Sequence, residues 1–418
     1  MNSAEVQPIF ERKLKDSGVK WIGEIPTNWL SASVGHLFRI KAGGDAKPDL
    51  YEYEYDDEHI YPVYTNTLDK NQVYAYSSKA YFHGPCITVT GRGAVGHAIY
   101  RENAFDAIIR LLVLTPRMKV SCRYYTYFID YVCHFFTNNA TIGQLSAEQI
   151  FPAKVCRPPL SEQQAIADFL DKKCAEIDGL LADLDAEVKT LAEYKKSIIA
   201  ETVTRGLNPN APMKQSGIPW AETIPAHWTT EKGKYLFVLR RTKGNPHNLE
   251  LMSPTQKFGV IPQSQVEGVV LVKEKTDLNT FRTIRPGDFC ISLRSFQGGF
   301  EYSKYEGVVS PAYQVFYPIK PIADGYFKYM LKSDGFISYI NTFSMSLRDG
   351  KNIAFEDFGN SYIPTPPIEE QEAIAAYLNK KCAMIDQSTA DKQTQIETLK
   401  SYKSSLIYEY VTGKKQVI

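Results

Sequence analysis

Residues 158–204 read PPLSEQQAIADFLDKKCAEIDGLLADLDAEVKTLAEYKKSIIAETVT, and residues 366–412 read PPIEEQEAIAAYLNKKCAMIDQSTADKQTQIETLKSYKSSLIYEYVT. The second stretch begins 208 residues after the first, at Pro366 instead of Pro158, and the two align without a gap. Of the 47 aligned positions, 25 are identical. Such self-similarity indicates a duplicated structural unit. Both copies have the composition of a long helix, so the chain is predicted to contain two equivalent helical segments.

The first copy has the pattern of a helix that packs against another helix. Between residues 162 and 204 there is one glycine and no proline, and Gly206 and Pro209 follow the pattern's end. We expect Ser161 and Gln164 to form a capping box at the start. The apolar residues alternate at steps of four and three, as in a coiled-coil seam. They are Ile177, Leu181, Leu184, Val188, Leu191 and Ile198.

The second copy keeps part of this apolar stripe, at Ile385, Ile396, Leu399 and Leu406. It also places Lys392 and Lys403 on the stripe, which predicts a weaker seam. A helix with a single apolar stripe is stable only when the stripe is covered, so we expect the two helices to pair. A twofold relation between the halves makes the pair antiparallel. The 28 residues from Ile177 to Thr204 would extend about 42 Å, against roughly 34–36 Å for one turn of B-DNA. This length suits a helix pair that sets the distance between two DNA half-sites, and it equally suits a rigid linker without that role.

A second repeat precedes the helices. Lys15-Asp16-Ser17-Gly18, Trp21, Ile25-Pro26 and Trp29 recur 199 residues later as Lys214-Gln215-Ser216-Gly217, Trp220, Ile224-Pro225 and Trp228. The chain therefore divides into a module at residues 1–157, a helical segment at 158–207, a second module at 208–365 and a second helical segment at 366–418. Each module is large enough to bury its own core.

The order of the repeats predicts how the chain closes. The motif that follows the first helix has its twin at the N-terminus, so we expect the region near residue 14 to lie beside residue 413. The fold class that we expect is α/β (α+β), with two globular modules separated by two long antiparallel helices that form a pseudo-twofold coiled coil.

Composition limits the class of protein. Of the 418 residues, 44% are hydrophobic and 23% are charged, as in an ordinary globular chain. There is no run of 18 apolar residues and no apolar signal-peptide core, so we expect a cytoplasmic protein outside the membrane. The seven cysteines include no Cys-x-x-Cys pair, and the seven histidines show no metal-ligand spacing. This pattern predicts free thiols and no metal site.

Positive charge is concentrated in the modules. Lysine and arginine exceed the acids by 17 to 16 in residues 1–157 and by 18 to 14 in residues 211–365. They number 6 against 10 acids in residues 158–210, and 7 against 7 in residues 366–418. This separation favours a basic face on each module and helices that avoid a polyanion.

A glycine-rich loop presents the first candidate contact. Residues 91–96 match the letters of the dinucleotide-binding motif G-x-G-x-x-G, but residues 97–100 read as another strand and no acid follows at the required distance. We therefore expect a turn between two strands that presents Arg92. Module 2 places Arg294 and Gln297 on a similar loop after the strand near residue 290.

Other candidates lie in two further pairs of segments. Asn138, Asn139 and Thr141 precede the last strand of module 1, as Arg348 and Lys351 do in module 2. Arg39 and Lys41 follow the first entrance motif, and Arg240, Arg241 and Lys243 follow the second. Amides and arginine suit base edges in duplex DNA, whereas lysine and arginine suit phosphates.

The repeated motifs identify a family resemblance. Ser-Gly-x-x-Trp with Ile-Pro-x-x-Trp opens each module, and Pro-Pro-x-x-Glu-Gln-x-x-Ile-Ala leads out of it into a long helix. This pattern resembles the specificity subunit of type I restriction-modification systems over nearly the whole chain. The resemblance implies two target recognition domains, each reading half of a split sequence in double-stranded DNA. It also implies helices that set the spacer and dock two methyltransferase subunits.

By the same resemblance, the chemistry belongs to the partners. The methyltransferase subunits would bind S-adenosylmethionine and methylate adenine, and a restriction subunit, where one is present, would use ATP and Mg to cleave DNA. This chain would have no catalytic residue and no cofactor. It lacks the Asn/Asp-Pro-Pro-Tyr/Phe motif of amino-methyltransferases and the Gly-x4-Gly-Lys-Ser/Thr phosphate loop. The alternatives are a self-contained DNA methyltransferase or nuclease and a coiled-coil protein-interaction scaffold.

Overall fold

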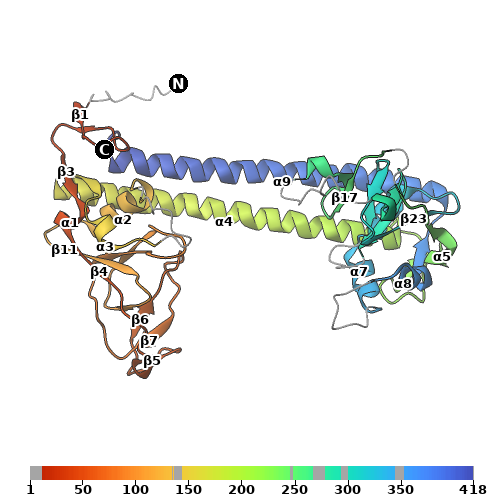
Figure 1. The fold of residues 1–418 in the computed structure, drawn as a ribbon, viewed down its shortest axis with the longest axis horizontal. Coiled ribbons are helices and arrows are strands. Elements are labelled where there is room, and N and C mark those ends of the chain that lie inside the picture. Colours follow the sequence, from red (N-terminus) through yellow and green to blue (C-terminus); the bar gives the residue numbers. More distant parts are fainter. Residues whose placement is uncertain are drawn as a thin grey trace. The chain divides into compact units, whose positions relative to one another are not determined.

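The computed structural model describes residues 12–133, 135, 144–244, 248–266, 278–292, 300–343 and 353–417. Its internal contacts divide the chain into two compact units. Unit 1 comprises Met1–Leu184 and Thr394–Ile418, and unit 2 comprises Asp185–Gln393. Each unit therefore contains one module together with one half of each long helix (Figure 1).

The described part of unit 1 contains two four-stranded sheets, with strand orders β4-β11-β8-β9 and β10-β6-β7-β5. Two shorter pairs join β1 to β2 and β3 to β12, both antiparallel. The strands are β1 (Leu14–Asp16), β2 (Glu24–Pro26), β3 (Leu30–Ser33), β4 (Phe38–Ala42), β5 (Tyr51–Glu52), β6 (Tyr61–Tyr64), β7 (Ala75–Ser77), β8 (Cys86–Val89), β9 (Ala98–Arg101), β10 (Asp106–Ala107), β11 (Leu112–Pro116) and β12 (Lys154–Arg157). The short helices are α1 (Val34–Leu37), η1 (Pro48–Leu50), α2 (Cys122–Tyr131) and α3 (Ala147–Ile150).

The sheet β4-β11-β8-β9 lies between two apolar clusters. Ile87 and Leu112 belong to the cluster that contains the buried face of α2, whereas Cys86 and Val113 belong to a cluster around Phe105. Successive residues of a strand point to opposite faces, so both faces of the central strands are buried. All four residues of β8 are buried, and β11 begins with the apolar run Leu112–Leu114, as expected for strands that are covered on both faces.

The described part of unit 2 repeats the same outline. The sheet β16-β23-β20-β21 corresponds to β4-β11-β8-β9, the pair β15-β24 to β3-β12, and the pair β13-β14 to β1-β2. Its strands are β13 (Met213–Gln215), β14 (Thr223–Pro225), β15 (Thr229–Lys232), β16 (Phe237–Leu239), β17 (Met252–Thr255), β18 (Gly259–Pro262), β19 (Arg282–Ile284), β20 (Phe289–Ser292), β21 (Glu301–Tyr302), β22 (Gly307–Val309), β23 (Tyr313–Pro318) and β24 (Tyr362–Thr365). The short helices are α5 (Gly233–Leu236), η2 (Gln263–Gln265), η3 (Leu278–Thr280), α6 (Asp324–Met330), α7 (Asp334–Asn341) and α8 (Phe355–Asn360).

The two long helices are α4 (Leu160–Arg205) and α9 (Ile368–Val411). The predicted capping box at Ser161 is wrong, because α4 already begins at Leu160 and Ser161 lies within its first turn. The amides of Glu162 and Gln163 instead donate to the carbonyl of Pro159 (both 3.0 Å). Proline cannot donate to a preceding turn, so the Pro-Pro pair itself sets the start of the helix.

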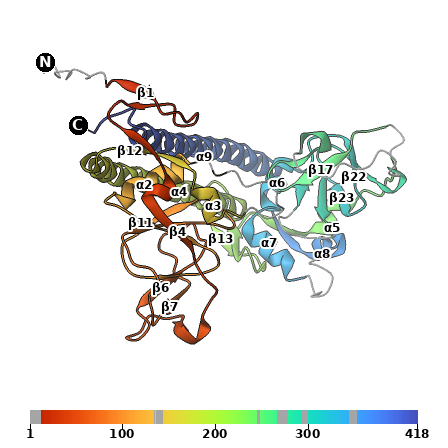
Figure 2. The ribbon, with the colours of Figure 1, turned by 60° about the vertical axis from the view of Figure 1, so that its left-hand side comes forward.

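Every predicted seam residue is buried or half-buried, and their neighbours on the outer face are exposed. In each unit α4 and α9 lie side by side (Figures 1 and 2). In unit 1, Ile177 shares a core with Leu406, and in unit 2, Ile198 shares a core with Ile385. Residue numbers therefore increase along α4 in the direction in which they decrease along α9. The predicted antiparallel pairing is confirmed.

The lysines on the seam are neutralised across the helix pair. Lys403 donates to Asp178 in unit 1 (2.6 Å), and Lys195 donates to Asp386 in unit 2 (2.6 Å). These two ion pairs are equivalent, because each lysine and each aspartate occupies the same position of the 208-residue repeat. Lys392 pairs with Glu187. The lysine stems can cover apolar seam surface while their ammonium groups reach the partner helix's acids.

The N-terminal motif closes onto the end of α9, as expected from the order of the repeats (Figure 2). The ammonium group of Lys414 donates to the carbonyl of Ile22 (2.9 Å), and the hydroxyl of Tyr408 donates to the same carbonyl (3.1 Å). Gly413 (φ 75°) ends the helix in the left-handed conformation, and a Cβ there would collide with Pro26 and Trp29. Gly206 (φ 73°) has the matching place at the end of α4.

Candidate nucleic-acid interface

Each module is attached to its helix by a tryptophan and a glutamate. In unit 1 the indole Nε1 of Trp29 donates to Oε2 of Glu162 (2.8 Å), and in unit 2 Trp228 donates to Glu370. Both indole rings are fully buried. The entrance and exit motifs recognised in the sequence therefore meet in space, and one charge-assisted hydrogen bond joins them in each unit.

A buried glutamine and a buried tyrosine complete the attachment. The side-chain oxygen of Gln163 accepts from the amide of Ser121 (2.9 Å), as that of Gln371 does from Ala323 (2.9 Å). The hydroxyl of Tyr124 donates to the carbonyl of Val411 (2.7 Å), and that of Tyr326 donates to the carbonyl of Val203 (3.1 Å). We use the term frame for these three contacts in each unit.

Sequence reasoning did not find the glutamines or the tyrosines of the frame. The glutamines stand in the repeated Pro-Pro-x-x-Glu-Gln motif, which was the available signal. The tyrosines lie in α2 and α6, 202 residues apart, within segments that otherwise share little sequence. The frame holds one side of each module against the helices, and the rest of the module is left for other contacts.

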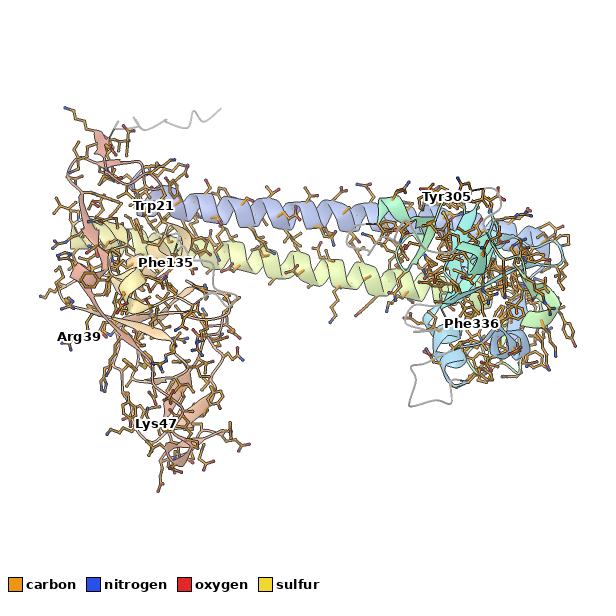
Figure 3. The ribbon with its side chains drawn as sticks, viewed as in Figure 1. Trp21, Arg39, Lys47, Phe135, Tyr305 and Phe336 are labelled. Carbon is orange, nitrogen blue, oxygen red and sulfur yellow. The ribbon has the colours of Figure 1, made fainter. Side chains whose placement is uncertain are left out.

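Module 1 presents two predicted residues on an edge strand. Arg39 and Lys41 lie two positions apart on β4, which forms one edge of its sheet, and both side chains are exposed. Figure 3 shows that Arg39 lies closer to α4 than Lys47 does. Lys47 is not free, because its ammonium group donates to the buried Asp106 (3.0 Å) and lies 3.6 Å from the centre of the Tyr81 ring.

Arg92 lies on the turn between β8 and β9, as predicted, and its side chain is exposed. The structure adds a second arginine beside it. The side-chain oxygen of Asn66 accepts from the amides of Gly91 (2.7 Å) and Arg92 (3.2 Å), while its nitrogen donates to the carbonyl of Ile109 (2.6 Å). Asn66 thereby ties the Arg92 turn to the turn that carries the exposed Arg110.

The turn at Arg110 is conformationally strained. Ile109 and Arg110 have positive φ angles of 56° and 62°, which cost an estimated 1–3 kcal/mol per residue without a glycine. The amide of Ile109 donates to the carbonyl of Gly44 (3.0 Å), so the strand that carries Arg39 and Lys41 ends against this same turn. Strained residues held in place by their surroundings are frequent at binding sites. Arginine's fixed fork of donors suits phosphates and base edges.

In module 2 the predicted residues are divided between two roles. Arg240 forms a bidentate ion pair with the buried Asp288 (2.6 and 2.7 Å) and lies over Tyr317, so its guanidinium already has a partner inside the protein. That hydrogen-bonded ion pair raises the pKa of Arg240. Arg241 and Lys243 are exposed. Seven other predicted contacts, Asn138, Asn139, Thr141, Arg294, Gln297, Arg348 and Lys351, lie outside the described residues.

The cysteine thiols are mostly buried. All seven cysteines are free thiols, as predicted, and six of them are buried. Burial raises the pKa of Cys86, Cys122, Cys133 and Cys156 to about 12 in each case, so these thiols stay protonated. Within the described ranges no group of three His, Cys, Asp or Glu side chains could hold a metal ion, and no helix is both long and apolar enough to cross a bilayer.

Comparison with known proteins agrees with this organisation. The family described as "Type I restriction modification DNA specificity domain" matches twice, at residues 26–190 and 223–398. The chain is 22% identical to a Methanocaldococcus jannaschii protein assigned as the type I restriction enzyme MjaX specificity subunit, over 95% of this chain and 96% of that one. It is 21% identical to the type I restriction enzyme EcoDI specificity subunit of Escherichia coli, over 89% and 84% of the two chains.

A solved structure has the same fold. The chain superposes on it with a TM-score of 0.67 and 13% identity, over 94% of this chain and 99% of that chain. The description of that structure concerns complex assembly and conformational transition of the type I restriction-modification system. The present chain belongs to the family of type I restriction-modification specificity subunits, with one DNA specificity domain on each module. Its two modules are thus recognition domains, and such a subunit is the non-catalytic component of its complex.

Proposed function

We propose that each module reads one half of a split sequence in double-stranded DNA. The observation that carries this proposal is that one frame occurs twice around two different interiors. The same Trp–Glu, Gln–amide and Tyr–carbonyl contacts hold both modules on the helices. A repeated attachment with unlike interiors suits a protein that holds two readers of different sequences in one arrangement.

In module 1 the residues that support this role are Arg92 and Arg110 on their tied turns, together with Arg39 and Lys41 on β4. We assign Arg92 and Arg110 to base edges or phosphates, and Lys41 to a phosphate, because lysine acts as a point charge. In module 2 we assign phosphate contacts to Arg241 and Lys243. Binding through such residues weakens as salt rises, because counterions are released from DNA on binding.

We further propose that the helices serve the assembly of the complex. Outside the seam, both helices expose polar and charged faces. These faces would dock two methyltransferase subunits, and the antiparallel pair would set the spacing between the two half-sites. The partners would supply the chemistry, with S-adenosylmethionine on the methyltransferase subunits and ATP and Mg on a restriction subunit. The subunit would act in the cytoplasm, where these partners meet DNA.

Exchanging one module tests the proposal. Residues 211–365 would be replaced with the second module of a relative, and the chimera would be expressed with its own methyltransferase subunit. We expect methylome sequencing to show a split adenine-methylated motif in which one half is new and the other is unchanged. A change in both halves would refute independent reading by the modules.

Binding measurements separate the proposal from its alternatives. Purified chain alone, given S-adenosylmethionine and DNA, should show neither methylation nor cleavage, whereas activity would favour a self-contained enzyme. Duplex binding by the complex should fall steeply between low and physiological salt. Binding that is equal for specific and unrelated duplexes and insensitive to salt would favour a protein-interaction scaffold.

A further inference from the structure

A pocket of about 750 Å³ lies in unit 2 between the β17–β18 hairpin, α6 and the two long helices. Five lysines line it, and they come from separate elements: Lys195, Lys257, Lys304, Lys328 and Lys332. Lys195 belongs to α4, Lys257 to the hairpin turn, Lys304 to the segment after β21, and Lys328 to α6. Glu301 and Asp386 are the carboxylates that also line the pocket. Positive charge therefore exceeds negative charge around one recess.

The two carboxylates neutralise two of the lysines. Lys195 donates to Asp386 (2.6 Å), and Lys332 donates to Glu301 (2.8 Å). Among the described residues, Lys257, Lys304 and Lys328 have no carboxylate within ion-pair distance; Lys257 and Lys328 lie only over neighbouring aromatic rings, those of Phe258 and Tyr329. Burial, together with the ammonium groups of Lys304, Lys332 and Lys195, lowers the pKa of Lys328. Lysines held this close repel one another and attract an anion that would neutralise them.

The corresponding pocket of unit 1 has the opposite character. It has a volume of about 490 Å³ and lies against α2 and α4. Tyr127 donates to Asp171 there (2.8 Å), as Tyr329 donates to Asn379 in unit 2 (2.9 Å), so the two pockets occupy matching places. Thr126 and Asp130 stand where Lys328 and Lys332 stand in unit 2.

Most of the charges that line the unit 1 pocket are paired within the protein, and its lining includes one lysine, Lys70. Asp130 binds His97 (2.7 Å), and Arg123 binds Asp168 and Asp171 (both 2.6 Å). The excess of lysine in unit 2 is therefore not a consequence of how the frame is built. It is a property of module 2 that the frame does not require.

The shape of the lysine pocket favours a compact anion over duplex DNA. Phosphates of a duplex are spread along a rod, at one charge per about 1.7 Å of axis, and are met by basic residues along a ridge or stripe. These lysines instead converge on one recess whose volume falls in the range of small-ligand sites, about 300–1,000 Å³. Phe258 and Tyr305 also line the pocket and are 64% and 43% exposed. Figure 3 places Tyr305 on the side of unit 2 near α9.

We propose that this pocket binds a nucleoside polyphosphate, with the ammonium groups of Lys257, Lys304 and Lys328 on its phosphates and with Phe258 or Tyr305 against its base. Lysine is a recurrent phosphate ligand, and aromatic rings stack on bases irrespective of their identity. Nothing in the proposal depends on how the modules read DNA.

Calorimetric titration of the full chain with ATP and, separately, with inorganic tripolyphosphate tests this site. We expect both probes to bind, and the double variant Lys304→Gln/Lys328→Gln to lose at least tenfold in affinity for both. Lys70→Gln, in the matching pocket of unit 1, is the control and should leave both affinities unchanged. Thermal unfolding of each variant shows whether the fold is kept.

A second pair of variants separates the base from the phosphates. Phe258→Ala and Tyr305→Ala should leave tripolyphosphate binding unchanged, and at least one of them should weaken ATP binding several-fold. If neither does, the nucleoside part of the proposal is wrong. Absence of binding by both probes at millimolar concentration, or equal binding by the folded lysine double variant, would overturn the site. Loss of duplex DNA affinity in that variant without tripolyphosphate binding by the parent would assign the lysines to the DNA backbone, which also overturns it.

Discussion

The two units agree where a module meets the helices and in one four-stranded sheet, and they differ beyond that sheet. Trp29, Gln163 and Tyr124 have counterparts that make the same contacts in unit 2. Beyond the shared sheet, unit 1 continues into the four-stranded sheet β10-β6-β7-β5, whereas unit 2 has the separate pairs β17-β18 and β19-β22. In the unit 1 pocket most lining charges are paired within the protein, whereas the matching pocket of unit 2 is rich in lysine. The residues that attach a module to the helices are therefore separate from those that differ between the modules, so the modules can diverge without disturbing their attachment.

Removing the frame tryptophans should have the largest effect on the stability of the individual units. Trp29→Ala and Trp228→Ala each delete a fully buried ring and remove the indole donor of Glu162 or Glu370, so each should cost about 3–5 kcal/mol in free energy of unfolding. The two glutamates keep their other partners, Arg12 and His227. Hydrogen exchange followed by mass spectrometry should show lost protection in unit 1 for the first variant and in unit 2 for the second. Equal loss in both units from either variant would show that the frames are not independent.

The two equivalent ion pairs of the helix seam should contribute different amounts to the free energy of unfolding, and this difference should be smaller than the effect of the tryptophan variants. The side chain of Lys403 is 17% exposed and that of Lys195 is 32% exposed. Removal of Asp178 therefore leaves the more buried of the two ammonium groups without its carboxylate partner. We expect Asp178→Ala to cost about 1–2 kcal/mol and Asp386→Ala about 0.5 kcal/mol in free energy of unfolding by denaturant. Asp183→Ala, on the exposed face of α4, is the control and should be close to neutral. Identical costs for the two variants would mean that burial does not set the strength of these pairs.

The smallest expected effect is the change with pH in the stability that the His97–Asp130 pair of the unit 1 pocket contributes. The hydrogen bond to Asp130 raises the pKa of His97. A raised pKa means that this interaction contributes its full stability below the ordinary histidine pKa of about 6.5 and loses it as the pH rises through the raised value. His97→Gln should therefore cost about 1 kcal/mol near pH 5 and markedly less near pH 9. A cost that is the same at both pH values would exclude a charged His97–Asp130 pair.

The sequence was sufficient for the helices and their closure, because these depend on repetition and periodicity. The seam residues, the antiparallel pairing and the meeting of the N-terminal motif with the end of α9 follow from the pattern of Ile177, Leu184 and their repeats. The capping box at Ser161 failed because the Pro158-Pro159 pair sets the start of α4 earlier than the polar signal indicated.

The candidate interface was harder to predict for a physical reason. Asn66, Arg92 and Arg110 come from three separate segments, and only the tertiary fold brings the two arginine-bearing turns together. Arg240 resembled a surface contact in the sequence, but its partner Asp288 lies 48 residues away and is buried. Short strands carry too few residues for their pairing to be read from periodicity. The Arg39, Lys41, Arg92, Arg241 and Lys243 contacts to DNA stay predictions.

The bond between Tyr124 and Val411 has a consequence for synthesis of the chain on the ribosome. Unit 2 is one continuous stretch, so all its contacts, including that of Tyr326 with Val203, can form once residue 393 has emerged. Unit 1 is interrupted and needs residues 394–418 to cover its core, although its module is made first. Domains generally fold in the order of their synthesis, starting from the N-terminus. Unit 1 therefore lacks the part of its core that α9 supplies until residues 394–418 have been synthesised, so we expect unit 2 to complete its contacts first.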